Sequence, residues 1–264
     1  MLVKEWRYFL LALGFFTRIP VPQHANFHED ELNYSTKYFP LVGVIVGLCG
    51  AAAFMLGTTV LPQHIAVLIS MATTIYLTGA FHEDGLADSA DGFGGGWQQE
   101  QILTIMQDSR LGTYGAAVLF FALFSKFQLL NTVSADFIPL VLIAAHTISR
   151  LAAVWVMATL PYAKPAGKAK PLATHISGRA LWLANLFGLL PYIGIIGLIL
   201  LSHPALLVIK LVAFTLAPMI LAWIWWRHKM NHWLNGYTGD TLGAMQQITE
   251  LGFYLGLVLW SVNA

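Results

Sequence analysis

Seven long apolar runs constrain this chain more than any other feature of its sequence. Each is about as long as the roughly 17 to 25 residues that a helix needs to cross a bilayer. Because backbone polar groups find no water in the hydrocarbon core, such a segment crosses it as a helix. The sequence therefore predicts an all-α polytopic membrane protein with about seven transmembrane helices. The runs lie at about residues 38–60, 64–81, 113–130, 137–160, 180–201, 205–226 and 241–262.

The composition and the N-terminus agree with that fold class. Hydrophobic residues make up 57% of the 264 residues and charged residues only 10%, which is not the composition of a soluble globule. The stretch before Pro20 mixes aromatic and charged residues into an apolar sequence, so we expect an amphipathic N-terminal helix and no cleavable signal peptide. Residues 1–264 contain no repeat and no low-complexity tract, which predicts a single integral membrane domain embedded in the lipid bilayer.

The connections between the runs are strongly asymmetric in charge. The longer, polar connections are residues 82–112, 161–179 and 227–240. Together with the segment before the first run they carry eleven Lys and Arg residues, whereas the short connections on the other side carry none. Since Lys and Arg concentrate in cytoplasmic loops, the long connections and the N-terminus are predicted to face the cytoplasm. The net charge is only +1, so no nucleic acid is expected as a partner.

Four charged residues fall inside the apolar runs: Lys126, Arg150, Lys210 and Glu250. Lys126 and Lys210 lie near the outer ends of their runs, where a lysine extends its ammonium to the interface. Arg150 and Glu250 each lie about ten residues, roughly 15 Å, from the cytoplasmic end of the helix, so we expect them to meet. Such a pair is either a structural lock or the floor of a polar cavity. We interpret His146, in the same run as Arg150, as a packing histidine.

The stretch FHEDGLADSADGFGGG at residues 81–96 concentrates ionisable side chains in this apolar chain. If it is helical, spacings of four and three residues place Asp84, Asp88 and Asp91 on one face. Three carboxylates so arranged repel one another unless a divalent cation lies between them, and hard oxygen ligands suit Mg²⁺, Mn²⁺ or Ca²⁺. We therefore predict a metal site on these residues, with Glu83 as a further candidate ligand. The alternative is an acidic, solvated loop without metal.

Two further motifs on the same side are typical of a site for phosphate groups. DSRLGTYG at residues 108–115 opens the third run, and GYTGDTLGA at residues 236–244 opens the seventh. Each places polar side chains and glycines at a helix N-terminus, where amides and the helix dipole favour an anion. The alternative is capping, by Asp108 or Ser109 in the first motif and by Asp240 in the second. The candidate substrate-binding residues are Asp108, Ser109, Arg110, Gly112, Thr238, Gly239 and Thr241.

These parts together indicate a reaction class. A carboxylate-bound metal beside glycine-rich helix starts and an arginine is typical of the transfer of a phosphate-linked group. His82 adjoins the carboxylates. It either transfers a proton or orients a ligand, or it has a structural role. The basic segment 164–179 is either the charge signal for orientation or a holder for an anionic substrate. The candidate catalytic residues are Asp84, Asp88, Asp91, His82, Arg110 and Asp240.

The three motifs, in this order and with FFTRIPVP at residues 15–22 before them, resemble the cobalamin (5'-phosphate) synthase family, also called adenosylcobinamide-GDP ribazoletransferase. The resemblance runs from about residue 10 to about residue 250 and maps the family's acidic motif onto Asp84, Asp88 and Asp91. It implies a Mg²⁺-dependent enzyme of the bacterial inner membrane with a cytoplasmic active site.

The reaction that this resemblance implies is the last nucleotide-loop assembly step of cobalamin biosynthesis. Adenosylcobinamide-GDP and α-ribazole or α-ribazole 5'-phosphate would give adenosylcobalamin or its 5'-phosphate, with release of GMP. On this hypothesis Arg110 neutralises the leaving phosphate, and either Asp240 or His82 takes the hydroxyl proton. A homo-oligomer is left open.

Two other functions are each compatible with part of the sequence. DSADG at residues 88–92 matches the start of the aspartate signature of the CDP-alcohol phosphotransferases, which make phospholipids. No Ala-Arg follows at the expected place, and no later pair of aspartates lies four residues apart. Intramembrane charges also occur in transporters, but a transporter would leave the acidic motif without a purpose. The resemblance is therefore the preferred interpretation.

Overall fold

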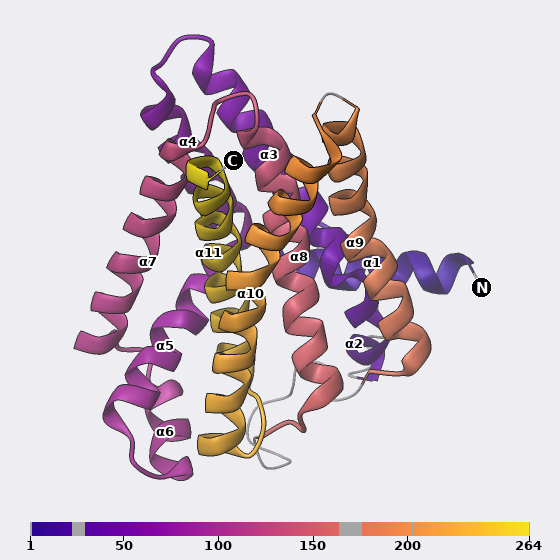
Figure 1. Cartoon of the computed structure of the whole chain (residues 1–264). Helices are drawn as coiled ribbons and strands as arrows, with labels where there is room; N and C mark the ends of the chain where they lie inside the picture. Colours follow the sequence, from indigo (N-terminus) through magenta and orange to yellow (C-terminus); the bar gives the residue numbers. More distant parts are fainter. Residues whose placement is uncertain (1, 23–29, 164–175, 202, 264) are drawn as a thin grey trace.

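The computed structural model describes residues 2–22, 30–163, 176–201 and 203–263. Over these ranges the chain is a bundle of α-helices with one short 3-10 helix and no strand (Figure 1). The predicted all-α fold is confirmed. The helices are α1 (Leu2–Phe16), α2 (Asp30–Ser35), η1 (Thr36–Tyr38), α3 (Phe39–Thr58), α4 (Gln63–Thr78), α5 (Phe81–Gly95), α6 (Gln99–Met106), α7 (Thr113–Thr132), α8 (Ile138–Thr159), α9 (Gly178–Leu200), α10 (Ala205–Leu234) and α11 (Gly239–Asn263).

Glycines four residues apart bring the long helices into close contact. Gly43 and Gly47 on α3 face α8, the most buried of the candidate spans. Gly252 and Gly256 on α11 face α10 in the same way. An added Cβ at any of the four would lie 3.0 Å or less from backbone atoms of the neighbouring helix. Small residues at this spacing let membrane helices pack backbone to backbone, so these two helix pairs form the frame of the bundle.

Fewer helices are long and apolar enough to cross a membrane than the seven predicted from the sequence. Among the described residues, five helices are long and apolar enough to cross, and α4 with α5 forms a sixth candidate that is bent by 84°. The remaining predicted span, α11, is 25 residues long. Its polar residues, Gln246, Gln247 and Glu250, are buried inside the bundle, so α11 needs less lipid-facing apolar surface than its neighbours.

The connections separate into two ends of the bundle, as the sequence predicts. Figure 1 shows the short α3–α4, α7–α8 and α9–α10 connections at one end, near the C-terminus. Helices α5 and α6 and the α10–α11 connection lie toward the other end. The basic residues Lys164, Lys168 and Lys170, which the sequence analysis assigns to this second end, lie outside the described residues.

Helix α1 is the predicted amphipathic N-terminal helix. It lies across the side of the bundle, whereas the long helices run along it (Figure 1). Leu13 and Phe16 are buried against the core, while Val3 and Trp6 are exposed. The helix ends before Pro20, and the backbone N–H of Arg18 then donates to the carbonyl of Leu77 at 2.7 Å. Helix α1 is thereby fixed beside the bend between α4 and α5.

Candidate active site

The three sequence motifs come together around α5. This helix packs against α7 and α11, whose first residues belong to the two glycine-containing motifs. An added Cβ at Gly85 would lie 2.7 Å from the backbone oxygen of Asp240, and one at Gly243 would lie 3.3 Å from Cα of His82. A side chain at Gly85 would therefore force the helices apart, and one at Gly243 would fit only tightly. The acidic motif and the start of α11 form one surface.

The acidic motif is helical, which is the condition under which its aspartates were predicted to share one face. Helix α5 continues through Gly85 to Gly95, so Asp84, Asp88 and Asp91 follow one another at single-turn spacing. They differ in depth: Asp84 is exposed, Asp88 is half-buried and Asp91 is buried. The acidic face thus runs from solvent into the protein.

Asp91 anchors the start of α7. Its Oδ2 accepts a hydrogen bond from the backbone N–H of Gly112 at 2.8 Å, and its Oδ1 accepts one from Gly115 at 2.9 Å. An added Cβ at Gly112 or Gly115 would collide with this carboxylate. A carboxylate at a helix N-terminus satisfies amides that have no partner within the helix and interacts favourably with its dipole. Asp91 therefore holds α5 and α7 together, and this role accounts for both glycines.

Substituting Gly115 by Ala should release this anchor. The new methyl group would occupy the space of the Asp91 carboxylate and lie 2.9 Å from the backbone oxygen of Ala87, so we expect a loss of about 1–3 kcal/mol of stability. Thermal unfolding of the purified variant in detergent measures this. Gly194→Ala is the matched control, because nothing lies within 4 Å of an added Cβ there. An unchanged unfolding midpoint for Gly115→Ala would contradict the anchor.

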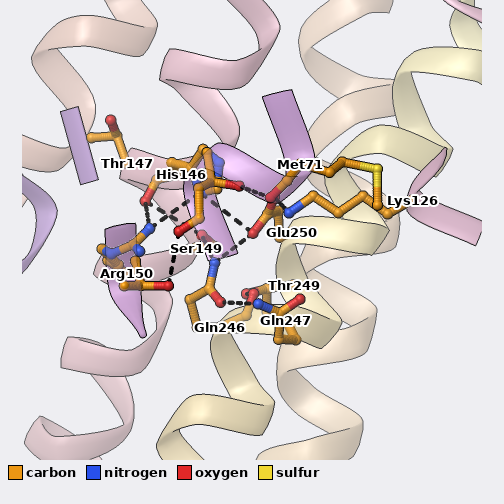
Figure 2. Close-up of polar contacts among 12 residues, drawn as sticks. Met71, Lys126, His146, Thr147, Ser149, Arg150, Gln246, Gln247, Thr249 and Glu250 are labelled. Atoms are coloured by element: carbon orange, nitrogen blue, oxygen red, sulfur yellow. Dashed lines mark hydrogen bonds and ion pairs between the residues drawn. The ribbon is translucent and has the colours of Figure 1, made fainter. Parts of the chain in front are cut away.

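Glu83 points away from the acidic face into the bundle. It is buried, and its Oε1 accepts a hydrogen bond from Nε2 of Gln247 at 3.0 Å. Gln247 Nε2 also donates to Oε1 of Gln246 at 2.9 Å, and Gln246 Nε2 donates to Oε2 of Glu250 at 2.6 Å. A hydrogen-bonded chain therefore leads from the acidic helix to an intramembrane glutamate, and Figure 2 shows its α11 portion.

That glutamate is paired with Lys126. Nζ of Lys126 lies 2.6 Å from Oε1 of Glu250, and the two side chains are 4% and 1% exposed. The hydroxyl of Tyr254 donates to the same oxygen at 2.8 Å. The prediction that Lys126 extends to the interface is therefore wrong: its ammonium turns inward, because the buried carboxylate on α11 compensates its desolvation. Lys210, by contrast, is exposed near the start of α10.

Arg150 belongs to the same cluster but is not the direct partner of Glu250. Its Nη1 donates to the backbone oxygen of His146 at 2.9 Å and lies 3.3 Å from Nδ1 of that ring. Between the described Arg150 and Glu250 side chains no ion pair is present, so the predicted pair is wrong. His146 stands between them, with Nδ1 3.6 Å from Oε2 of Glu250 (Figure 2). The imidazole was predicted to pack, and it also carries polar contacts.

The cluster is a lock and not the floor of a large cavity. It joins α7, α8 and α11, because Gln246 also donates to Oγ of Ser149 at 3.0 Å. The cavity beside it, lined by His82, Arg150 and Gln246 among others, has a volume of only about 20 Å³. A space of this size holds about one water molecule. The lock therefore stabilises α7 and α11, the two helices against which the acidic helix α5 packs.

His82 is enclosed at the other side of this small cavity. It is 4% exposed, and its ring stacks on Phe16 of α1 with centroids 5.8 Å apart and planes 14° apart. The backbone of His82 packs closely against α11 at Gly243. These surroundings favour the structural role among those weighed for this histidine.

The start of α11 is closed by a reciprocal cap. Oγ1 of Thr238 accepts from the N–H of Thr241 at 3.2 Å, and Oγ1 of Thr241 accepts from the N–H of Thr238 at 2.8 Å. This is the capping-box arrangement, with threonine in place of the usual Glu or Gln. Thr238, not Asp240, is thus the helix cap. Both hydroxyls are fully buried, whereas Gly239 and Asp240 are half-buried at the surface.

The loop before α7 presents a surface ion pair. Arg110 donates from its backbone N–H to Oδ1 of Asp108 at 3.0 Å, and its guanidinium contacts both carboxylate oxygens. The Arg110 guanidinium and N–H lower the pKa of Asp108 to about 2, so the pair is intact at any pH well above that value. Ser109 is exposed and Gly112 half-buried. Arg110 is 87% exposed and can reach a ligand on the acidic face only from the solvent side.

Three residues of this region were not predicted from their sequence patterns. Lys126 was assigned to the interface, and Gln246 and Gln247 were not considered. A signal was present: two adjacent glutamines precede Glu250 in an apolar run, with Gln246 and Glu250 one turn apart. Polar residues inside a membrane span usually face one another in the bundle interior.

The acidic face fits Mg²⁺ through two of its aspartates. Among the described residues, no three His, Cys, Asp or Glu side chains converge into a preformed metal site. Asp91 is engaged by amides and Glu83 by Gln247. Asp84 and Asp88 lie one turn apart on this face, Asp84 exposed and Asp88 half-buried. Proteins commonly bind Mg²⁺ through one or two carboxylates, with water and substrate phosphates completing the octahedron.

Comparison with known proteins gives one consistent result. The family model described as cobalamin-5-phosphate synthase matches residues 8–258. An adenosylcobinamide-GDP ribazoletransferase of Shewanella amazonensis is 44% identical over 98% of this chain and 97% of its own length. The protein of the same name from Ralstonia pickettii is 42% identical over 97% of both chains. No solved structure matches the chain. With a family match over nearly its full length and relatives above 40% identity, the chain belongs to the cobalamin-5-phosphate synthase family.

Proposed function

We propose that this protein is a Mg²⁺-dependent adenosylcobinamide-GDP ribazoletransferase of the bacterial inner membrane. The observation that carries the proposal is the near full-length similarity to relatives of that name. The three motifs that suggested the family surround one helix, α5, in the folded chain. Neither a CDP-alcohol phosphotransferase nor a transporter is favoured by the family match.

The reaction joins adenosylcobinamide-GDP to α-ribazole or its 5'-phosphate. The ribazole 3' hydroxyl oxygen bonds to the β-phosphorus, the bond from that phosphorus to the GMP oxygen breaks, and GMP leaves. Asp84 and Asp88 would hold Mg²⁺, which when bound neutralises charge on the phosphates. Arg110, at the solvent edge, would bind the leaving phosphate. Asp240 would take the hydroxyl proton, since it is half-buried beside Gly85 of α5 whereas His82 is enclosed.

A direct assay tests this function. The purified protein in phospholipid nanodiscs is given adenosylcobinamide-GDP and α-ribazole, and GMP is measured with Mg²⁺ and with EDTA. We expect GMP to form in equal amount to the cobalamin product and only with a divalent cation. Product formation without GMP, or an equal rate in EDTA, would overturn the reaction or the metal requirement respectively.

The active site is proposed to face the cytoplasm, because eleven Lys and Arg residues lie on that side by sequence. Cysteine labelling tests this in cells that carry Cys49→Ala, since Cys49 is the only cysteine. A cysteine at exposed Gln107 should resist an impermeant maleimide added outside spheroplasts, and one at exposed Ser134 should react. The reverse pattern would invert the orientation.

A further inference from the structure

A second polar cavity lies on the α1 side of the bundle. It has a volume of about 290 Å³, and the described residues lining it come from α1, α2, η1 and the start of α9. None of the assigned roles above uses these residues. The function of this cavity is therefore separate from that of the candidate active site.

The walls of this cavity carry excess positive charge. Lys37 is paired with Glu5, and the hydroxyl of Tyr38 donates to Oε2 of Glu5 at 2.7 Å. Burial raises the pKa of Glu5, but Lys37 and Tyr38 outweigh it and lower the pKa overall, so this carboxylate is ionised and balances one lysine. Lys4 and Arg179 also line the cavity, and neither has an ion-pair partner among the described residues. Among the described lining residues, three basic side chains face one carboxylate, which leaves two positive charges in excess.

The other walls suit an amphiphilic ligand. The rings of Tyr8 and Tyr34 stack with centroids 5.3 Å apart, and Nζ of Lys37 lies 5.4 Å from the centroid of Tyr8. Ser177 caps α9 by accepting from the N–H of Ala180 at 3.3 Å. The N-terminal end of α9, whose dipole favours a negative charge, therefore forms part of the wall.

An apolar stripe continues from the cavity along the outside of α9. Trp182, Leu186 and Leu190 follow Arg179 at single-turn spacing, and all three are exposed. Trp6 of α1 is exposed as well. Tryptophan and basic residues at one level are typical of the membrane interface, and an exposed apolar helix face next to them contacts acyl chains.

We propose that this cavity binds the phosphate headgroup of an anionic phospholipid, with its acyl chains lying along α9. Lys4 and Arg179 supply the charge, because basic pockets between helices at the cytoplasmic interface bind anionic headgroups. The tyrosines and the α9 N-terminus complete the headgroup site. The inference depends on the fold and on the membrane interface, and it stands whether or not the proposed reaction is correct.

The test is native mass spectrometry of the full chain released from nanodiscs that hold equal amounts of phosphatidylglycerol and phosphatidylcholine. We expect one phosphatidylglycerol to be retained preferentially. Lys4→Gln with Arg179→Gln should weaken this retention roughly thirtyfold, since each basic side chain near an anionic lipid contributes about a factor of five. Lys4→Arg with Arg179→Lys should keep it.

Lys210→Gln is the matched control, because Lys210 is an exposed lysine in the second turn of α10. The α9–α10 connection that precedes it lies at the end of the bundle near the C-terminus (Figure 1). A similar loss in this variant would show nonspecific charge attraction and overturn the site. Equal retention of phosphatidylcholine would also overturn it. Glycerol 3-phosphate forms the second arm: if it binds the wild type, is lost in the double glutamine variant, and phosphatidylglycerol shows no preference, the ligand is a soluble phosphate ester and the lipid proposal fails.

Discussion

Asp88→Asn should lower the rate of GMP release by more than about 100-fold, because even partners outside the direct ligand shell of a metal cost 10 to 100-fold when mutated. The substitution keeps the size of the side chain and removes the charge that would hold Mg²⁺. Asp84→Asn should behave alike. The measurement is the steady-state rate as a function of Mg²⁺ concentration, and part of the loss in each single variant should be recovered at high Mg²⁺ or with Mn²⁺.

Three comparisons make this prediction sharp. Glu100→Gln removes an exposed carboxylate from α6, close along the chain to the acidic motif, and should leave the rate unchanged. Asp84→Asn and Asp88→Asn should unfold at the wild-type temperature. Asp91→Asn should not, because an amide oxygen cannot replace both carboxylate acceptors of the α7 amides, which costs about 1–3 kcal/mol. Wild-type turnover by Asp88→Asn with an unchanged Mg²⁺ dependence would remove Asp88 from the metal site.

Breaking the Lys126–Glu250 pair should have the largest effect on stability. Lys126→Met or Glu250→Leu alone leaves one buried charge without its partner, which costs about 3–5 kcal/mol. The double variant removes both charges and should recover most of this loss, since an apolar pair is often as stable as a buried ion pair. Thermal unfolding in detergent, analysed as a double-mutant cycle, gives the coupling.

The control for the pair is Lys210→Met, which replaces an exposed lysine and should change stability by less than about 0.5 kcal/mol. Strictly additive effects of Lys126→Met and Glu250→Leu would mean that the two side chains do not interact. The same cycle with Arg150→Met and Glu250→Leu should show weaker coupling, because Arg150 contacts the cluster through His146.

The sequence was sufficient for the fold class and for the end of the bundle at which the motifs lie, but not for which charges pair. Hydrophobic length and carboxylate spacing are local properties, so the all-α membrane fold and the shared face of Asp84, Asp88 and Asp91 follow from the chain alone. The 84° bend between α4 and α5, which lowers the number of candidate spans, does not. The partner of Glu250 depends on how α7, α8 and α11 are rotated about their axes in the folded bundle, which spacing along one helix does not contain. Spacing along single helices therefore placed Arg150 at the right depth and still assigned the wrong cation.

In the candidate active site, too, the sequence indicated the kind of group that a helix start binds but not which group binds there. A glycine-rich helix start indicated an anion, and at α7 the anion is the protein's own Asp91. At α11 the hydroxyl oxygens of Thr238 and Thr241 each accept a hydrogen bond from the backbone N–H of the other residue. Neither outcome is visible in sequence, because a helix N-terminus is satisfied equally well by a ligand or by a side chain from elsewhere in the fold.

The two attachments of α5 determine how a bulky substrate can be admitted. Asp91 ties one side of the helix to the amides of α7, and Glu83 ties the other side to Gln247 of α11. Turning α5 about its axis would break both, so the floor of the site is rigid. The loop around Asp108 and Arg110 is exposed and bonded mainly to itself. Adaptation to substrates of different size is therefore expected to take place in this rim, with the acidic helix serving as a fixed reference surface.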